Sequence, residues 1–295
     1  MYPKEYDRNI EIRKECKNSI NLDNSGLGYR WLNKLFRKMS MLGMVLIICA
    51  SVITIVEATE TGTRQYGATL QIPPEKLLNN VWGAPYYERQ SENLNSYIYY
   101  NSEGTYGWEW NRWNPINVDS YVRPIYPEVM LDSDSGYLPK KLNDVSSISA
   151  ELQYSYVKPP TGSYNFAYDI WLTYGGAREA EVMIWIDCST TADCAPGTYA
   201  GDVNDGNNTY SVYYRNPRSS TSWSVYAFIL NNRTPVPLYH KVDIKALLNS
   251  LSTRLNDEWI ISSVELGNEI WEGSGRIEIS EWLININNAT INLRK

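Results

Sequence analysis

The stretch Glu181–Asp187 (EVMIWID) is the most informative part of the sequence, because its residues alternate in character along a strand-like run. One set is purely aliphatic and the other mixes carboxylates, a thioether and an indole; the sets are Val182, Ile184, Ile186 and Glu181, Met183, Trp185, Asp187. Successive side chains of a β-strand point to opposite faces of the sheet. The aliphatic set therefore predicts a face toward an ordinary core. The mixed set suits neither plain solvent nor a core, which indicates a functional face.

Two further segments carry the same mixture of acids and tryptophan. In NFAYDIW, Asp169 shares one face with Trp171, and in VELGNEIW, Glu269 shares one face with Glu265 and Trp271. A glutamate on an exposed strand face is most often simply solvated, yet its repetition beside tryptophan favours a groove. Sugar rings stack on aromatic faces, and two facing carboxylates can act as nucleophile and general acid in glycoside cleavage.

The region 62–295 has a β pattern throughout. Strand-like runs separated by Gly-, Pro- and Asn-rich turns are predicted at 97–100, 106–113, 147–156, 164–172, 181–186, 210–214, 223–230, 260–270 and 276–286. One segment, Asp243–Leu251 (DIKALLNSL), has the apolar spacing of a helix. Many strands and one short helix predict a single all-β domain, a sandwich of two antiparallel sheets. Trp223, Trp259 and Trp282 are candidates for its core.

The composition narrows the classes of function. With 295 residues and a formal net charge of -6, the chain lacks the basic surface that a general nucleic-acid binder needs, so we expect no nucleic-acid partner. Its 24 Tyr and 11 Trp far exceed its 3 Phe, a bias typical of aromatic residues that keep one edge in water. The single histidine, His240, argues against a zinc site and is expected to be structural. We expect no metal, no other cofactor, and a monomer.

The N-terminal part carries a membrane signal. The segment 39–57 contains an uncharged apolar run (MSMLGMVLIICASVITIV), and a basic tail, 1–38, precedes it. The run is intermediate in length between a signal-peptide core and a spanning helix, and the positive-inside rule keeps the tail in the cytoplasm. The segment therefore predicts an N-terminal anchor, a signal cleaved near residue 58, or a start of translation at one of its methionines. A buried core helix is the remaining alternative.

A location outside the cell favours one disulfide. Cys188 and Cys194 close a short loop (DCSTTADC) just after the alternating stretch, and oxidising compartments favour such pairs. Cys16 and Cys49 fall in the tail and the apolar run, so they are expected to be free thiols.

Taken in order along the chain, these segments resemble glycoside hydrolase family 12, the cellulase H type of endo-β-1,4-glucanases. EVMIWID resembles the nucleophile strand of that family, and GNEIWEG (267–273) resembles its second carboxylate motif. The resemblance extends to NNVWGA (79–84), LNDVSSIS (142–149), AYDIW (167–171), WSVYAFIL (223–230) and DIKALLNSL (243–251). It runs from residue 79 to residue 282 and leaves residues 1–61 outside.

The resemblance implies a β-jelly roll whose concave sheet forms an open cleft for a β-glucan chain. It implies retaining hydrolysis of internal β-1,4-glucosidic bonds in cellulose, carboxymethylcellulose, β-glucan or xyloglucan. Glu181 would be the nucleophile, Glu269 the general acid/base, and Asp169 the aspartate that hydrogen-bonds the nucleophile. Substrate-binding roles carry over to Asn80, Trp82, Met183, Trp185 and Trp271.

Two hypotheses from other classes stand beside this one. A non-catalytic glycan-binding jelly roll would have the same groove, but it would not require Glu181 and Glu269 as a pair. A membrane-anchored surface protein, assembling through its tyrosine-rich sandwich, would present flat apolar patches in place of a groove of tryptophans and acids.

Overall fold

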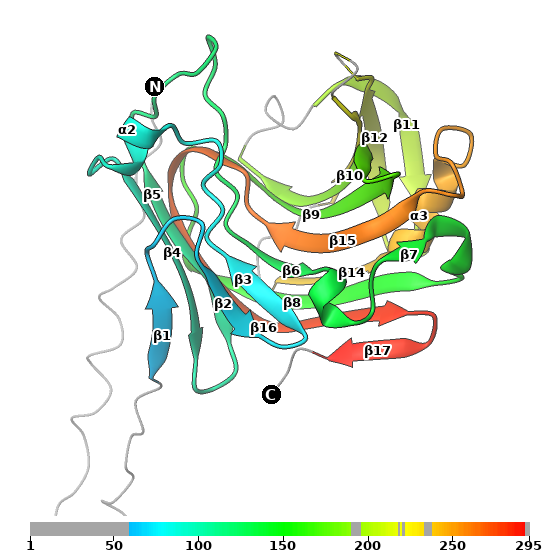
Figure 1. Cartoon of the computed structure of the whole chain (residues 1–295), viewed down its shortest axis with the longest axis horizontal. Helices are drawn as coiled ribbons and strands as arrows, with labels where there is room; N and C mark the ends of the chain where they lie inside the picture. Colours follow the sequence, from blue (N-terminus) through cyan, green and yellow to red (C-terminus); the bar gives the residue numbers. More distant parts are fainter. Residues whose placement is uncertain (1–58, 190–195, 218, 220–221, 233–237, 293–295) are drawn as a thin grey trace, which may run out of the picture. The chain divides into compact units, whose positions relative to one another are not determined.

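The computed structural model describes residues 59–189, 196–217, 219, 222–232 and 238–292. Its strands form two stacked, curved layers (Figure 1). The outer layer contains, in spatial order, β1 (Glu60–Thr63), β4 (Leu94–Asn101), β5 (Tyr106–Arg112), β16 (Ile270–Ile286), β8 (Ile148–Lys158) and β14 (Leu238–Asp243), with β17 (Ala289–Asn292) beside the end of β16. Every pairing in this layer is antiparallel.

We call the second layer the cleft layer, because its concave face carries the pocket described below. It contains, in spatial order, β2 (Thr69–Ile72), β3 (Glu75–Leu78), β6 (Glu128–Leu131), β15 (Ile260–Gly267), β9 (Ser163–Tyr174), β10 (Ala177–Cys188), β13 (Ser224–Leu230), β12 (Thr209–Arg215) and β11 (Thr198–Asn204), with β7 (Lys140–Lys141) beside the start of β15. A short β9–β16 pairing joins the two layers.

The predicted all-β sandwich is confirmed, with one departure from purely antiparallel sheets. Strands β10 and β13 pair in parallel, whereas their neighbours pair antiparallel. The intervening β11 and β12 form an antiparallel hairpin on the far side of β13. This excursion brings the chain back beside β10 in the same direction, which a tight hairpin could not do.

Each of the nine predicted strand runs falls in a strand of the structure, but the expected single run 260–270 is two strands. Strand β15 ends at Gly267 and β16 begins at Ile270. Side-chain bonds replace the ladder in between: Asn268 Nδ2 donates to the Asn165 carbonyl at 2.8 Å, and its Oδ1 accepts from Trp108 Nε1 at 2.8 Å. Asn side chains compete with regular backbone pairing in this way. The strand is therefore interrupted beside Glu269.

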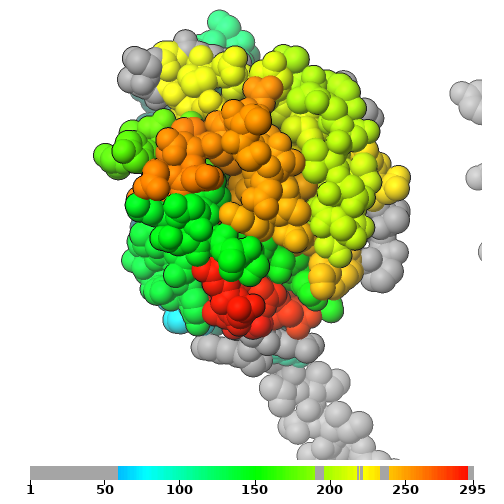
Figure 2. Space-filling view, turned by 90° about the vertical axis from the view of Figure 1, so that its right-hand side faces the viewer, coloured from blue at the N-terminus to red at the C-terminus, as the bar shows by residue number. Residues whose placement is uncertain are grey.

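The predicted helix is α3 (Ile244–Ser250), and Asp243 caps it by accepting from the Ala246 N–H at 2.9 Å. The sequence pattern did not indicate the one-turn helix α2 (Tyr86–Arg89) or the 3₁₀ turns η1 (Ser133–Ser135) and η2 (Leu142–Asp144). Figure 2 views the side on which the segment around α3 (orange), strands β11 and β12 (yellow-green) and the C-terminal strands (red) share one surface.

The main core lies between the layers and follows the predicted alternation. Its fully buried members include Phe166, Tyr168 and Ile170 of β9, Val182 and Ile184 of β10, and Trp108, Trp110 and Trp282 from the outer layer. Trp259 packs against this core but is only partly buried. His240 is buried with its Nε2 3.0 Å from the Tyr210 hydroxyl, in keeping with a structural role.

The predicted N-terminal tail 1–38 and membrane or signal segment 39–57 lie outside the described residues, as does Cys194. The Cys188–Cys194 disulfide therefore stays a prediction. Among the helices in the described part of the chain, none is long and apolar enough to cross a membrane.

Candidate active site

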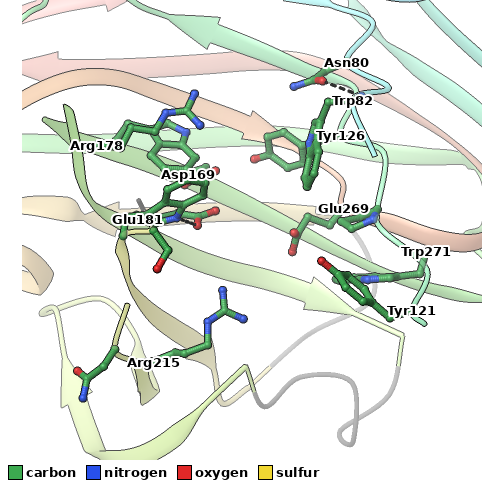
Figure 3. Close-up of a pocket in the computed structure, with 15 residues that line it drawn as sticks. Asn80, Trp82, Tyr121, Tyr126, Asp169, Arg178, Glu181, Arg215, Glu269 and Trp271 are labelled. Atoms are coloured by element: carbon green, nitrogen blue, oxygen red, sulfur yellow. Dashed lines mark hydrogen bonds between the residues drawn. The ribbon is translucent and has the colours of Figure 1, made fainter. Parts of the chain in front are cut away.

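A pocket of about 760 Å³ lies on the concave face of the cleft layer. Six predicted site residues line it: Asn80, Trp82, Asp169, Glu181, Glu269 and Trp271. The other lining residues are Tyr121, Pro124, Tyr126, Trp171, Arg178, Arg215, Asn216, Ser222 and Trp223. In Figure 3 the carboxyl groups of Glu181 and Glu269 face each other across this space, with Arg178 beside Glu181 and with Trp271 and Tyr121 beside Glu269.

Glu181 lies on β10, where it pairs in register with Trp171 of β9 and with Val225 of β13. Its Oε2 accepts a 2.6 Å hydrogen bond from Trp223 Nε1. Burial raises the pKa of Glu181, while the Trp223 hydrogen bond and the charge of Arg215 counteract that rise. A donor and a nearby cation both favour the ionised carboxylate, which is the form that attacks as a nucleophile.

Glu269 stands in the break between β15 and β16, where Asn165 fixes it. The Asn165 side chain donates from Nδ2 to Glu269 Oε2 and accepts from the Glu269 N–H at 3.1 Å. Burial, followed by repulsion from Glu181, raises the pKa of Glu269 to about 8. A carboxyl with that pKa keeps its proton at neutral pH and can donate it.

A third carboxyl group, that of Asp169, lines the pocket, and two more buried acids lie behind it. Asp169 of β9 lies directly opposite Glu265 of β15, and both are buried. Burial raises the pKa of Asp169 well above its usual range, and the charges of Glu181 and Glu265 add to the effect. Burial and Glu265 also raise the pKa of Glu128 on β6. Asp169 is therefore expected to hold a proton that it can share with Glu181.

The wall on the Glu269 side offers aromatic and amide groups to a ligand. Trp82 and Tyr121 are 58% and 51% exposed, so their rings are free to pack against a sugar. Asn80 is held in place by donating to Glu128 Oε1 at 2.9 Å, and its Oδ1 accepts from the Trp82 N–H at 3.2 Å. Gly83 allows this segment to lie close to the backbone of Pro124, where a Cβ would meet the carbonyl oxygen at 1.9 Å.

Two predicted substrate-binding residues are not in the pocket lining. Met183 and Trp185 share the face of Glu181, but they are only 4% and 3% exposed in a second hydrophobic cluster with Ala167, Val225 and Ala227. The geometry therefore does not indicate direct contact between these two side chains and substrate. They pack beside the pocket, where a change would act through its shape.

Among the lining side chains that the pattern of residues did not single out are Arg178, Arg215 and Trp223. Arg178 escapes the alternation because the register of β10 slips between Arg178 and Ala180, and such a bulge turns a side chain to the other face. Trp223 was a core candidate. It shares its parity with Val225 and Ala227 of the second cluster, so alternation read backward from WSVYAFIL would have placed it on the cleft face.

Glu272, which follows closely after the second carboxylate motif, is exposed, and it does not line the pocket. Within the described residues, no group of three or more His, Cys, Asp or Glu side chains is arranged to hold a metal ion.

Comparison with known proteins identifies one family. The family model of glycosyl hydrolase family 12 matches residues 78–287, which is more than half of the chain. Endoglucanase S of Pectobacterium parmentieri is 31% identical over 225 residues, an alignment that covers 71% of this chain and 81% of that protein.

Solved structures share the fold. The family 12 xyloglucanase of Bacillus licheniformis superposes with a TM-score of 0.63 at 28% identity, covering 77% of this chain and all of that one. The xyloglucanase domain of NopAA, an effector of Sinorhizobium fredii solved with cellobiose, gives a TM-score of 0.61 at 18% identity, covering 77% of this chain and 99% of that one. At that lower identity the likeness concerns the fold alone.

Proposed function

The chain belongs to glycosyl hydrolase family 12 and is therefore a glycoside hydrolase of the cellulase type; from this premise we propose that it is a retaining endo-β-1,4-glucanase. The observation that carries the proposal is the pair of carboxyls facing each other across one pocket, Glu181 from β10 and Glu269 from the break before β16. Their surroundings differ, which is the condition for dividing the roles of nucleophile and acid between two chemically identical groups.

In the first step the Glu181 carboxylate attacks the anomeric carbon while Glu269 donates its proton to the glycosidic oxygen. The bond to the leaving sugar breaks, and a glycosyl ester of Glu181 forms. In the second step Glu269, now ionised, takes a proton from water, and the water oxygen displaces Glu181 from the anomeric carbon. Two inversions leave the configuration unchanged. A retaining pair requires carboxyl groups roughly 5–5.5 Å apart, whereas about 6.5–9.5 Å would indicate inversion.

The supporting residues have distinct tasks in this scheme. Asp169, buried next to Glu181, shares a proton with the nucleophile and limits its repulsion of neighbouring acids. Asn80 and Trp82 hold the sugar on the glycone side, one by hydrogen bonds to hydroxyls and the other by its exposed face. Trp271 extends this wall beside Glu269.

The substrate class follows from the relatives and from the pocket. One relative is an endoglucanase and a solved relative is a xyloglucanase, so we propose β-1,4-glucans both with and without side branches. Such polymers lie outside cells, which agrees with a domain exported behind the segment 39–57. We propose that this segment either anchors the enzyme or is removed on export, and that the enzyme acts as a monomer.

The decisive experiment measures reducing-sugar release from cellulose, carboxymethylcellulose, mixed-linkage β-glucan and xyloglucan by the wild type, Glu181→Gln and Glu269→Gln. Each variant should lose at least about 1000-fold in kcat with unchanged thermal unfolding, because each removes a group that takes part in bond breaking. Glu272→Gln is the matched control, since that glutamate is exposed and does not line the pocket.

Azide then separates the two roles. Added azide should rescue Glu181→Gly with an inverted glycosyl azide, and Glu269→Gly with a retained one, because the small anion replaces the missing group from opposite faces of the sugar. A folded wild type that binds glucan columns but releases no sugar from any polymer would instead establish the non-catalytic binding module.

A further inference from the structure

Arg178 at the start of β10 lies over two tryptophans of the pocket. Its guanidinium carbon is 4.0 Å from the ring centroid of Trp171 and 5.5 Å from that of Trp223. The two indoles meet edge to face, with centroids 5.1 Å apart and an interplanar angle of 74°. We call Arg178, Trp171 and Trp223 the arginine-capped pair. Cation–π and edge-to-face contacts of this kind each stabilise a fixed ring orientation.

Both indoles of the arginine-capped pair use their N–H groups on carboxylates. Trp223 Nε1 donates to Glu181 Oε2 at 2.6 Å, and Trp171 Nε1 donates to Glu265 Oε2 at 3.3 Å. An indole has one donor and no acceptor. The ring orientation that the stack imposes therefore decides where each donor points.

The ring faces on this side of the pocket are less available to a sugar than those on the opposite wall. Trp171 is 8% exposed beneath the Arg178 guanidinium, whereas Trp82 across the pocket is 58% exposed. The tryptophans on the two walls of the pocket therefore differ in what they present. One wall presents open ring faces, and the other presents N–H donors to acids.

We propose that the arginine-capped pair positions the nucleophile: Arg178 holds Trp171 and Trp223 so that the Trp223 N–H orients the Glu181 carboxylate toward the anomeric carbon and keeps it ionised. The inference rests on the proposed function and extends it, because none of the three side chains takes part in bond breaking. Trp223 and Arg178 are positioning residues in this account.

The effect of Trp223 has to be judged against the other charges that face Glu181. Those groups are Asp169 of β9, Glu265 of β15, Glu269 before β16, Arg215 at the end of β12, and Arg178 on its own strand. Three are acids and two are exposed arginines, so water screens the cations more than the acids. Among these contacts, we therefore expect the loss of the Trp223 hydrogen bond to change the pKa of Glu181 most.

The first test compares Trp223→Phe with the wild type on 2,4-dinitrophenyl cellobioside, whose leaving group needs no acid catalyst. Phe keeps an aromatic ring for Arg178 but removes the N–H. We expect the single-turnover rate constant for glycosylation to fall about 10-fold or more, while the dissociation constant of the substrate changes less than about two-fold. Because the donor favours the charged form, its loss should raise the pKa of Glu181 and move the acid limb of kcat/KM to higher pH.

The second test removes the cap without touching the hydrogen bond. Arg178 is exposed, so Arg178→Gln should fold normally; it should slow the same step by a smaller factor and move the acid limb in the same direction. Arg254→Gln is the matched control, because Arg254 lies over Tyr214 at 4.2 Å, and neither residue lines the pocket. The rate of glycosylation and the pH dependence of kcat/KM in that control should match those of the wild type.

A Trp223→Phe enzyme with an unmoved acid limb and a loss confined to the dissociation constant of the substrate would overturn the proposal and make Trp223 a residue that binds sugar. Unchanged kinetics in Arg178→Gln would show that Arg178 has no part in positioning the nucleophile. These outcomes are distinct from a failure of the proposed function, in which the wild type itself would hydrolyse neither the aryl cellobioside nor any glucan.

Discussion

At the scale of single residues, the site works by giving chemically identical side chains different surroundings. Both glutamates are buried and face the charge of Arg215, but Glu181 receives an indole N–H, whereas Glu269 receives one amide and the repulsion of Glu181. The raised pKa of Glu269, about 8, leaves it protonated where ordinary glutamates are ionised. The indole donor on Glu181 favours its ionised form, so one glutamate can act as nucleophile while the other donates a proton.

The pH profile tests this arrangement. Glu269 must carry a proton for the first step, so kcat/KM should fall as pH rises through about 8. Arg215 favours the charged form of both glutamates, so Arg215→Gln should move both limbs of the profile to higher pH. The shift should be less than about one unit, because Arg215 is exposed and screened.

The measurement is a series of kcat/KM values between pH 4 and 10 for the wild type and Arg215→Gln at constant ionic strength, repeated at high salt. High salt should shrink the difference between the two enzymes, because it screens an exposed charge. A profile that moves to lower pH, or that stays in place at low salt, would contradict the assignment.

At the scale of elements, strand alternation separated the side chains of β9 and β10 that face the main core from those on the opposite face, but it did not show that Met183 and Trp185 on that face are buried beside the pocket. It was not enough where the backbone leaves the ladder. The Asn268 break is held by contacts from distant strands, and the bulge at Arg178 lies in the pairing of β10 with β9; alternation along one strand records neither. Glu269 still faces the pocket, although it does so from a break and not from a continuous strand.

A buried ion pair lies behind the Glu269 side of the pocket. Arg112 of β5 is fully buried, donates from Nε to Glu88 Oε1 of α2 at 2.6 Å, and donates from Nη1 to the carbonyls of Arg123 and Ile270, each at 2.7 Å. One guanidinium thus connects α2, the segment before Tyr126 and the residue after Glu269.

Arg112→Met should therefore lower the free energy of unfolding by about 3–5 kcal/mol, because it leaves the Glu88 carboxylate buried without its partner. Chemical denaturation of the variant measures the loss. Lys141→Met is the control, since the Lys141–Glu258 pair is about half exposed and should add little. Equal stability in both variants would show that the Arg112 pair contributes no more than a surface contact.

At the scale of the whole domain, the curved cleft layer determines how a polymer can bind. Exposed side chains lie on both sides of the pocket: Trp82 and Tyr121 on the side of Glu269, and Arg178 on the side of Glu181. A glucan chain can therefore lie across the carboxyl pair with both of its ends in solvent. This arrangement favours cleavage at internal bonds over release of units from a chain end.

The mode of attack is visible in the viscosity of carboxymethylcellulose plotted against the reducing ends released. Internal cleavage should follow the curve given by random acid hydrolysis of the same polymer, because each cut shortens the chains most when it falls far from an end. Cleavage from an end would release many reducing sugars while the viscosity stayed high, and that result would exclude an open cleft. Trp82→Ala should follow the same curve as the wild type but require roughly 10-fold more substrate to reach half its maximal rate, since one sugar loses its aromatic partner while both ends of the pocket stay exposed.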